Sequence, residues 1–82
     1  MNRVVPADAL AQATEVLVQR LANGPTAAYG SLKRLMRTSL QNTLDQQLEA
    51  ETQAFMVCAQ TADFTEGVGA FLDKREAQFT GN

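Results

Sequence analysis

The sequence predicts an all-α fold of about four short amphipathic helices in an open arrangement, without a sheet. Apolar residues recur at spacings of three and four along most of the chain, which is the period of a helix with one buried face. Glycine, proline and polar cap residues divide the chain into four such stretches, and no alternating strand pattern is longer than Val4-Val5. With 82 residues, the chain forms one small domain at most.

The first two helices are expected on either side of a Gly-Pro break. Pro6 suits a first helical turn, so a helix is expected over residues 7–22. Gly24 is expected to end it in a left-handed conformation, and Pro25 cannot continue it. Thr26 is expected to cap a second helix. The predicted inward residues of these two helices are Leu10, Ala13, Leu17, Leu21, Tyr29, Leu32, Met36 and Leu40.

Two further helices follow, each with a predicted capping box. Thr43 and Gln46 have that spacing at the start of the third helix. Near residue 63, Asp63 is expected to cap the fourth helix, with Glu66 returning the bond. The predicted apolar faces carry Leu44, Leu48, Phe55, Cys58 and Ala59 in the third helix, and Phe64, Val68, Phe71 and Leu72 in the fourth. Residues 78–82 are expected to form an irregular tail.

The fourth helix is short and contains Gly67 and Gly69, yet it carries large aromatic residues. This combination predicts that apolar surface stays exposed, which in soluble proteins usually marks an interface. On the third helix, Glu51 is expected to pair with Lys33 of the second, which would fix the register of the two helices; a general base is the less favoured reading of Glu51.

Composition excludes several classes of function. A net charge of −2 gives no electrostatic case for nucleic acid or an anionic membrane. No apolar run approaches the roughly 20 residues of a membrane span, and no signal peptide is expected. The chain has no histidine and a single cysteine, Cys58, which excludes Ser-His-Asp and Cys-His catalysis and leaves no metal site to expect. A cytoplasmic protein is therefore expected.

Four segments, in order, carry a family resemblance. They are NRVVPADAL at residues 2–10, Asn23-Gly24-Pro25 followed by Lys33, Glu49-Ala50-Glu51, and TADFTEGVGAFLDKR at residues 61–75. Together they resemble the C-terminal helical domain of the enoyl-CoA hydratase/isomerase (crotonase) family. The resemblance covers essentially the whole chain, residues 1–82.

The resemblance implies a role in an enzyme but no catalytic residue in these 82 residues. In this family the N-terminal domain supplies both the N–H groups that hold the thioester oxyanion and the carboxylates that move protons. The implied partners are that catalytic domain and further copies in a trimer or hexamer. The implied substrate is an acyl-CoA thioester from fatty-acid or phenylacetate-type catabolism, and no separate cofactor is expected.

Three residues match family positions that border the CoA thioester. Phe55 and Phe71 match aromatics near the acyl and pantetheine region, and Lys74 matches a lysine that approaches the CoA phosphates. The alternatives are that the aromatics are core residues and that Lys74 is a solvated cation at a helix end. After Lys74, Glu76-Ala77-Gln78 replaces a more commonly basic or proline-containing segment, which weakens the phosphate interpretation.

Two functions remain open from the sequence. The first is an oligomerisation and pocket-flanking domain of an enoyl-CoA hydratase or isomerase, inactive by itself. The second is a stand-alone helical interaction module without enzymatic activity. The reading frame upstream of these residues distinguishes them.

Overall fold

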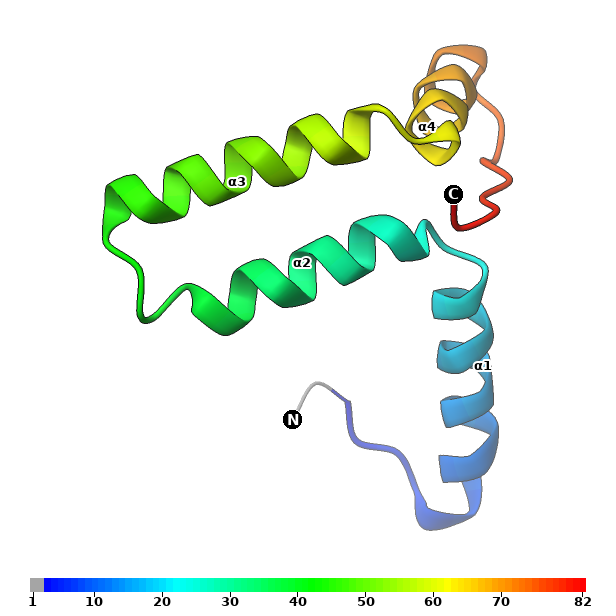
Figure 1. Cartoon of the computed structure of the whole chain (residues 1–82). Coiled ribbons are helices and arrows are strands. Elements are labelled where there is room, and N and C mark those ends of the chain that lie inside the picture. The colour runs from blue at the N-terminus through cyan, green and yellow to red at the C-terminus, as the bar shows by residue number, and fades with distance from the viewer. Residues whose placement is uncertain (1–2) are drawn as a thin grey trace.

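A computed structural model describes residues 3–82, and within that range the fold is all-α (Figure 1). A short 3₁₀ turn precedes four α-helices, and no strand occurs in the described residues. Their bounds are η1 Ala7–Ala9, α1 Leu10–Ala22, α2 Thr26–Thr38, α3 Leu44–Ala59 and α4 Ala62–Asp73. Both the predicted fold class and the number of helices are confirmed.

The first helix ends where expected, but for a different reason. Gly24 is not among the residues with positive φ, so its role is not a left-handed turn. Gly24 is buried, and a Cβ built on it would lie 2.7 Å from two ring carbons of Tyr29. The glycine is therefore required because the Tyr29 ring lies directly against the backbone at the turn between α1 and α2.

We expect Gly24→Ala to destabilise the chain by about 1–3 kcal/mol, because the Tyr29 ring must move away from the new methyl group. Chemical denaturation of Gly24→Ala, Tyr29→Ala and the double variant measures this. The penalty of Gly24→Ala should largely disappear in the Tyr29→Ala background. Additive effects of the two substitutions would show that the ring is not the obstacle.

The start and the packed face of α2 differ from the prediction. Thr26 is the first residue of the helix, not its cap, and Pro25 precedes it without a side-chain capping bond. The predicted inward residues Leu32 and Met36 are largely exposed, and Leu40 lies beyond the helix with 99% of its surface accessible. The residue of α2 that is buried is the small Ser31.

The third helix starts with the predicted capping box. The Gln46 amide donates to Thr43 Oγ1 at 3.2 Å, and the Thr43 amide donates to Gln46 Oε1 at 2.9 Å. The predicted buried face is confirmed only for its small residues: Cys58 and Ala59 are less accessible, whereas the large residues Leu44, Leu48 and Phe55 are exposed. The other less accessible positions of α3 are Gln47, Ala50 and Ala54, which were not predicted.

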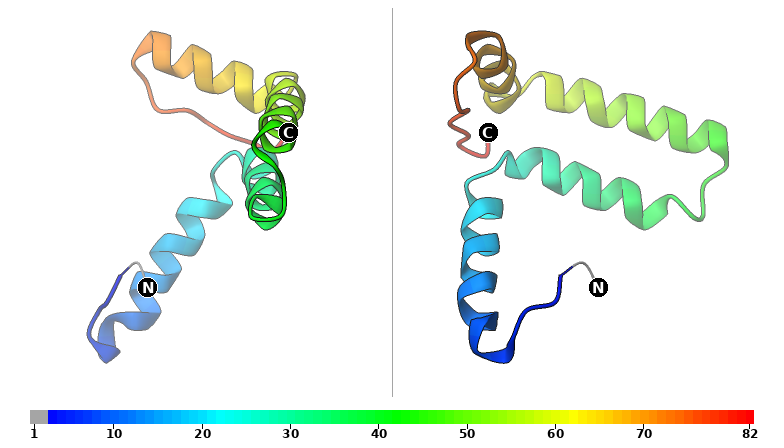
Figure 2. Two further views of the ribbon diagram at one scale, coloured as in Figure 1. Left: turned by 90° about the vertical axis from the view of Figure 1, so that its left-hand side faces the viewer. Right: turned by 180° about the vertical axis from the view of Figure 1, so that it is seen from behind.

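Helices α2 and α3 form an antiparallel hairpin (Figures 1 and 2). Between the two helices the Cys58 thiol lies 3.7 Å from Ser31 Oγ. Glu51 accepts a hydrogen bond from Gln47 of its own helix, and both salt bridges among residues 3–82 involve Arg75. The predicted Glu51–Lys33 pair is therefore not formed.

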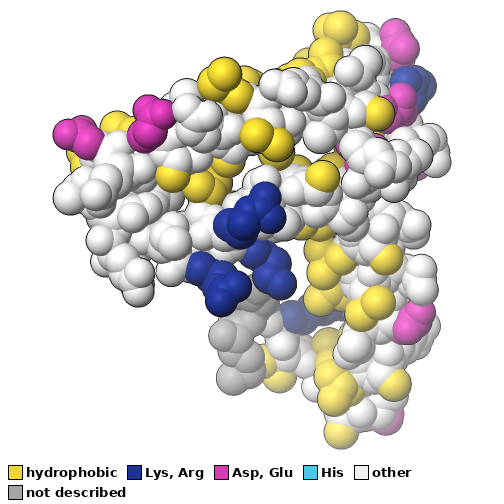
Figure 3. All heavy atoms as spheres, viewed as in Figure 1, with side chains coloured by type: hydrophobic (Ala, Val, Ile, Leu, Met, Phe, Trp, Pro, Cys, Tyr) yellow, Lys and Arg dark blue, Asp and Glu magenta, His cyan; other side chains and the backbone are white. Residues whose placement is uncertain are grey.

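The chain is open, as predicted. Its principal extents are 46 × 37 × 19 Å, and α1 points away from the α2–α3 hairpin (Figure 2). Among the described hydrophobic residues only Ala70 is buried. Figure 3 shows hydrophobic side chains at the surface along the inner side of α1 and over α3. In the described residues, no helix has the length and apolar character of a membrane span.

Candidate functional site

An apolar groove lies where the start of α2, the end of α3, helix α4 and the C-terminal tail meet. Its volume is about 390 Å³, within the range of small-molecule pockets. Asp63 is the only charged residue of its lining. The lining residues are Pro25, Ala27, Ala28, Cys58, Thr61, Asp63, Phe64, Gly67, Val68, Phe71, Leu72 and Phe79. Such a lining can hold an apolar group and offers no free polar group for acid–base chemistry.

The three predicted site residues have different relations to this groove. Phe71 lies on its wall, although 82% of the side chain is exposed. Phe55 is outside the lining but meets Phe64 edge-on, with ring centroids 6.0 Å apart and planes at 89°. Lys74 is the C-cap of α4, in a left-handed conformation with φ of 55°, and is not part of the lining. Phe71 is thus part of the groove lining, Phe55 contacts the lining residue Phe64, and Lys74 stays at the helix end.

Asp63 has a role that the sequence did not indicate. The expected capping box of Asp63 and Glu66 is wrong, because Thr61 is the N-cap of α4 and its hydroxyl accepts the Phe64 amide at 3.1 Å. The Asp63 carboxylate accepts instead from the backbone amides of Thr80 and Gly81, each at 2.8 Å. The one local feature that could have indicated this role is Thr61: because Thr61 can cap the helix, Asp63 is not needed as the cap and is free for another contact.

Glu66 also binds the tail and does not return a cap. Its carboxylate pairs with Arg75 at 2.6 Å and 3.2 Å and accepts the Gln78 amide at 2.9 Å. The Arg75 hydrogen bond, followed by that of Gln78, lowers the pKa of Glu66 from 4.5 to about 2, and the same pair raises the pKa of Arg75. The lowered pKa shows that the ionised form of Glu66 holds the tail.

A pH titration tests this contact. Because the pKa of Glu66 is lower in the folded chain, its contribution is complete above about pH 4.5 and is lost as the pH falls toward about 2. The amide resonance of Gln78 should therefore shift in that interval, and Glu66→Gln should abolish the shift. A Gln78 transition centred near pH 4.5 would contradict the contact.

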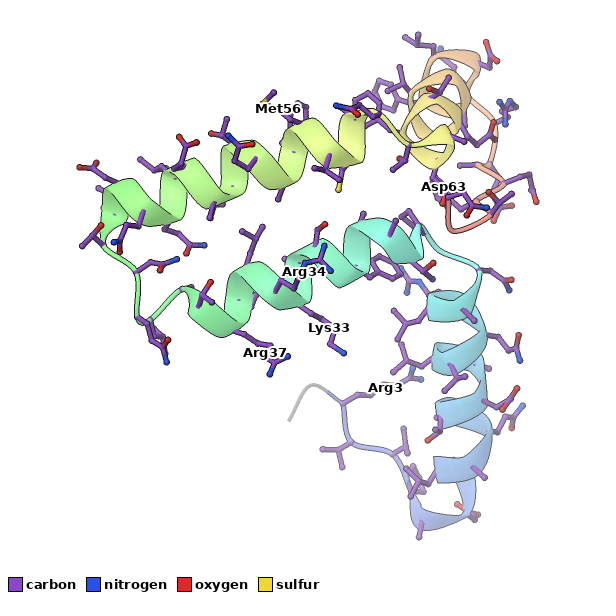
Figure 4. The ribbon with its side chains drawn as sticks, viewed as in Figure 1. Arg3, Lys33, Arg34, Arg37, Met56 and Asp63 are labelled. Carbon is purple, nitrogen blue, oxygen red and sulfur yellow. The ribbon has the colours of Figure 1, made fainter. Side chains whose placement is uncertain are left out.

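The basic residues of α2 are outside the groove. Lys33 and Arg37 project from α2 on the side away from α3, and Arg34 lies across the front of α2 (Figure 4). The Arg34 guanidinium donates to Ser31 Oγ of the same helix at 3.0 Å. These side chains therefore contribute to a solvated face and not to the groove.

Comparison with known proteins gives the family. The family model described as enoyl-CoA hydratase/isomerase matches residues 1–82. The chain belongs to the enoyl-CoA hydratase/isomerase family. Among curated members of this family, the chain is 40% identical over 79 residues to the 1,2-epoxyphenylacetyl-CoA isomerase of Escherichia coli K12, covering 96% of this chain and 30% of that protein. It is 46% identical over 61 residues to a probable enoyl-CoA hydratase of Rhodobacter capsulatus, covering 74% of this chain and 24% of that protein.

Solved structures of the family have the same arrangement of helices. A crystal structure of enoyl-CoA hydratase subunit I from Geobacillus kaustophilus HTA426 matches with a TM-score of 0.91 and 32% identity, covering 100% of this chain and 32% of that one. A second enoyl-CoA hydratase structure from the same organism gives a TM-score of 0.89 and 27% identity, covering 100% of this chain and 31% of that one. The chain thus spans about a third of the length of these family members.

Proposed function

We propose that these 82 residues act as the C-terminal helical domain of an enoyl-CoA hydratase or isomerase. In this role they pack against a catalytic domain and further copies of the protein, and they border the bound acyl-CoA. The observation that carries the proposal is the amount of surface that the chain leaves uncovered.

Two measures of the open shape support this. A compact folded chain of 8.9 kDa has an accessible surface of about 4,800 Å², whereas this chain exposes 6982 Å². Its radius of gyration is 16.0 Å, and a compact domain of this length has about 12 Å. The excess of about 2,000 Å² is more than twice the roughly 800 Å² that each partner buries in a standard interface. The helices therefore have the surface of a domain that is completed by other polypeptide.

The groove supports the second part of the proposal. Its apolar wall suits the hydrocarbon and pantetheine parts of a CoA thioester, and Phe71 lies on that wall. Lys74 lies three residues beyond Phe71, where an exposed ammonium group attracts a phosphate from solution. In this proposal Phe55 supports the wall through Phe64, and catalytic groups come from the remaining two thirds of the protein.

Kinetics of the longer protein test the groove. In these residues joined to the polypeptide that their gene encodes upstream, Phe71→Ala should raise KM for an acyl-CoA about tenfold and leave kcat nearly unchanged, because the lost contact is the same in substrate and transition state. Lys33→Ala is the control, since Lys33 is exposed on a solvated face and lies off the groove. An unchanged KM for Phe71→Ala would contradict the assignment.

The second candidate is a stand-alone interaction module. The capping box of α3 and the bonded tail favour it, because both define local structure without any partner. A stop codon directly upstream would support the module, and a continuous reading frame encoding the rest of the family's length would support the enzyme domain.

A further inference from the structure

The last five residues form a strap that runs from α4 back to the start of α2 (Figures 1 and 2). We call residues 78–82 the C-terminal strap. Phe79 lies in the groove lining, where a Cβ on Gly67 would be 3.5 Å from its ring. At Gly81 the backbone has φ of 87°, and a Cβ there would lie 2.7 Å from Thr26 Oγ1. The strap therefore forms one side of the groove and closely approaches α2.

Asp63 binds the strap through both its side chain and its backbone. Besides the two amide bonds, Thr80 Oγ1 lies 3.4 Å from the Asp63 carboxylate, and the Asp63 amide donates to the Asn82 carbonyl at 2.8 Å. Only 4% of Asp63 is exposed (Figure 4 shows it beside the strap). A carboxylate that is removed from water must recover its hydrogen bonds. The strap supplies the hydrogen bonds that this carboxylate accepts.

A comparison within the chain separates this role from ordinary helix stabilisation. Asp63 is the second residue of α4 after the cap Thr61, and Asp45 is the second residue of α3 after the cap Thr43. Both aspartates lie at the positive end of a helix dipole, where a carboxylate is stabilised. Asp45 is exposed and lies at the far end of α3 from the strap (Figure 1). The contacts of Asp63 with the strap are thus additional to the dipole interaction.

We infer that Asp63 is a positioning residue: it holds the C-terminal strap in place, and through the strap it holds Phe79 as one wall of the apolar groove. This wall also limits the width of the groove that is available to the acyl chain of a thioester, which rests on the proposed function. Glu66 supports the same strap at its start through the Gln78 amide.

Hydrogen exchange and fluorescence test the positioning role. The chain contains no tryptophan, so Phe79→Trp places a single indole reporter on the groove wall, which can be excited apart from Tyr29. In that background Asp63→Asn should speed amide exchange of Thr80 and Gly81 at least about tenfold, since each loses a bond to a charged acceptor. It should also shift the emission of the reporter indole to the red. The control Asp45→Asn should change neither signal.

Gly81→Ala provides a second variant that leaves Asp63 intact. A side chain at this φ is strained and meets Thr26, so the strap should detach and the indole emission should again shift to the red, while circular dichroism reports intact helices. Unchanged exchange and emission in Asp63→Asn would overturn the inference. Equal changes in Asp45→Asn would also overturn it, because the effect would then be one of the helix dipole alone.

Titration of the Phe79→Trp chain with hexanoyl-pantetheine, followed by its indole emission, separates the inference from the proposed function. With the strap in place we expect weak saturable binding, and adding Asp63→Asn should weaken it at least about threefold. If the Phe79→Trp chain does not bind the ligand, the proposed function of the groove is contradicted. If it binds, and the affinity is the same after Asp63→Asn is added, the role of the strap is contradicted.

Discussion

A calorimetric titration of the 82-residue chain with crotonyl-CoA should give a Kd no tighter than about 1 mM, which corresponds to about −4 kcal/mol. The groove is open on the side of Phe71, of which 82% is exposed, so a ligand there keeps much of its contact with water. Lys74 is an exposed cation, and an attraction to phosphate in water is weak at salt concentrations of a cell. Neither feature can supply the affinity of a complete pocket.

The same chain should not hydrate crotonyl-CoA. Its groove offers one carboxylate, Asp63, whose bonds are used by the C-terminal strap. Thioester chemistry requires donors for the oxyanion and an acid or base within reach of the substrate. The same titration and activity assay are made with a longer protein that also contains the polypeptide encoded upstream. For that protein we expect turnover and micromolar binding. Micromolar binding or turnover by the 82 residues alone would contradict the proposal.

The second large effect is expected in calorimetric unfolding. Globular proteins absorb about 0.7 kcal/mol per residue near 60 °C, which gives about 60 kcal/mol for a chain of this length. The chain buries slightly less than half of its extended surface, and Ala70 is the single buried hydrophobic residue in the range 3–82. A compact chain of this length buries about 60% of its extended surface, so we expect about three quarters of that enthalpy and a broad transition.

Substitution of Leu40 tests whether the low unfolding enthalpy comes from surface that a partner normally covers. Leu40 is 99% exposed, so Leu40→Gln should leave the unfolding of the 82-residue chain unchanged. In the longer protein, where we propose that other polypeptide covers this surface, the same substitution should lower the Tm. A sharp transition of about 60 kcal/mol in the short chain would instead show a self-sufficient domain.

Local sequence signals predicted the helices and most of their ends. Thr43 and Gln46 formed the capping box that their spacing indicated, and the Gly-Pro break separated α1 from α2. These features depend on residues within one or two helical turns of each other, so they can be predicted from a short stretch of sequence. The open arrangement was also predictable, because the short glycine-containing fourth helix had more aromatic surface than its neighbours could cover.

The face that each helix packs could not be read from apolar spacing. Leu44, Leu48 and Phe55 have helical periodicity, yet they point to solvent, while the smaller Ala54 and Cys58 are less accessible. Periodicity shows which face of a helix is apolar, but it does not show whether the same chain or another polypeptide covers that face. The exposed large residues of the predicted face are therefore the ones we propose to be covered by a partner, whereas Cys58 of the same predicted face lies against Ser31 inside the hairpin.

The role of Asp63 was missed for a different reason. Its spacing to Glu66 fits a capping box, but its partners Thr80 and Gly81 are 17 and 18 residues away. A local pattern cannot show that contact, and Thr61 already satisfies the start of the helix. Likewise, Gly24 reads as a turn glycine, and only the structure shows that the ring of Tyr29 requires it.

A small-angle scattering series at decreasing concentration tests most directly whether these helices need a larger partner. If they do, the 82-residue chain should keep a radius of gyration of 16.0 Å or more at every dilution, because nothing within it can close the space between α1 and the α2–α3 hairpin. A monomer that contracts to about 12 Å, the value for a compact domain of this length, would contradict the account.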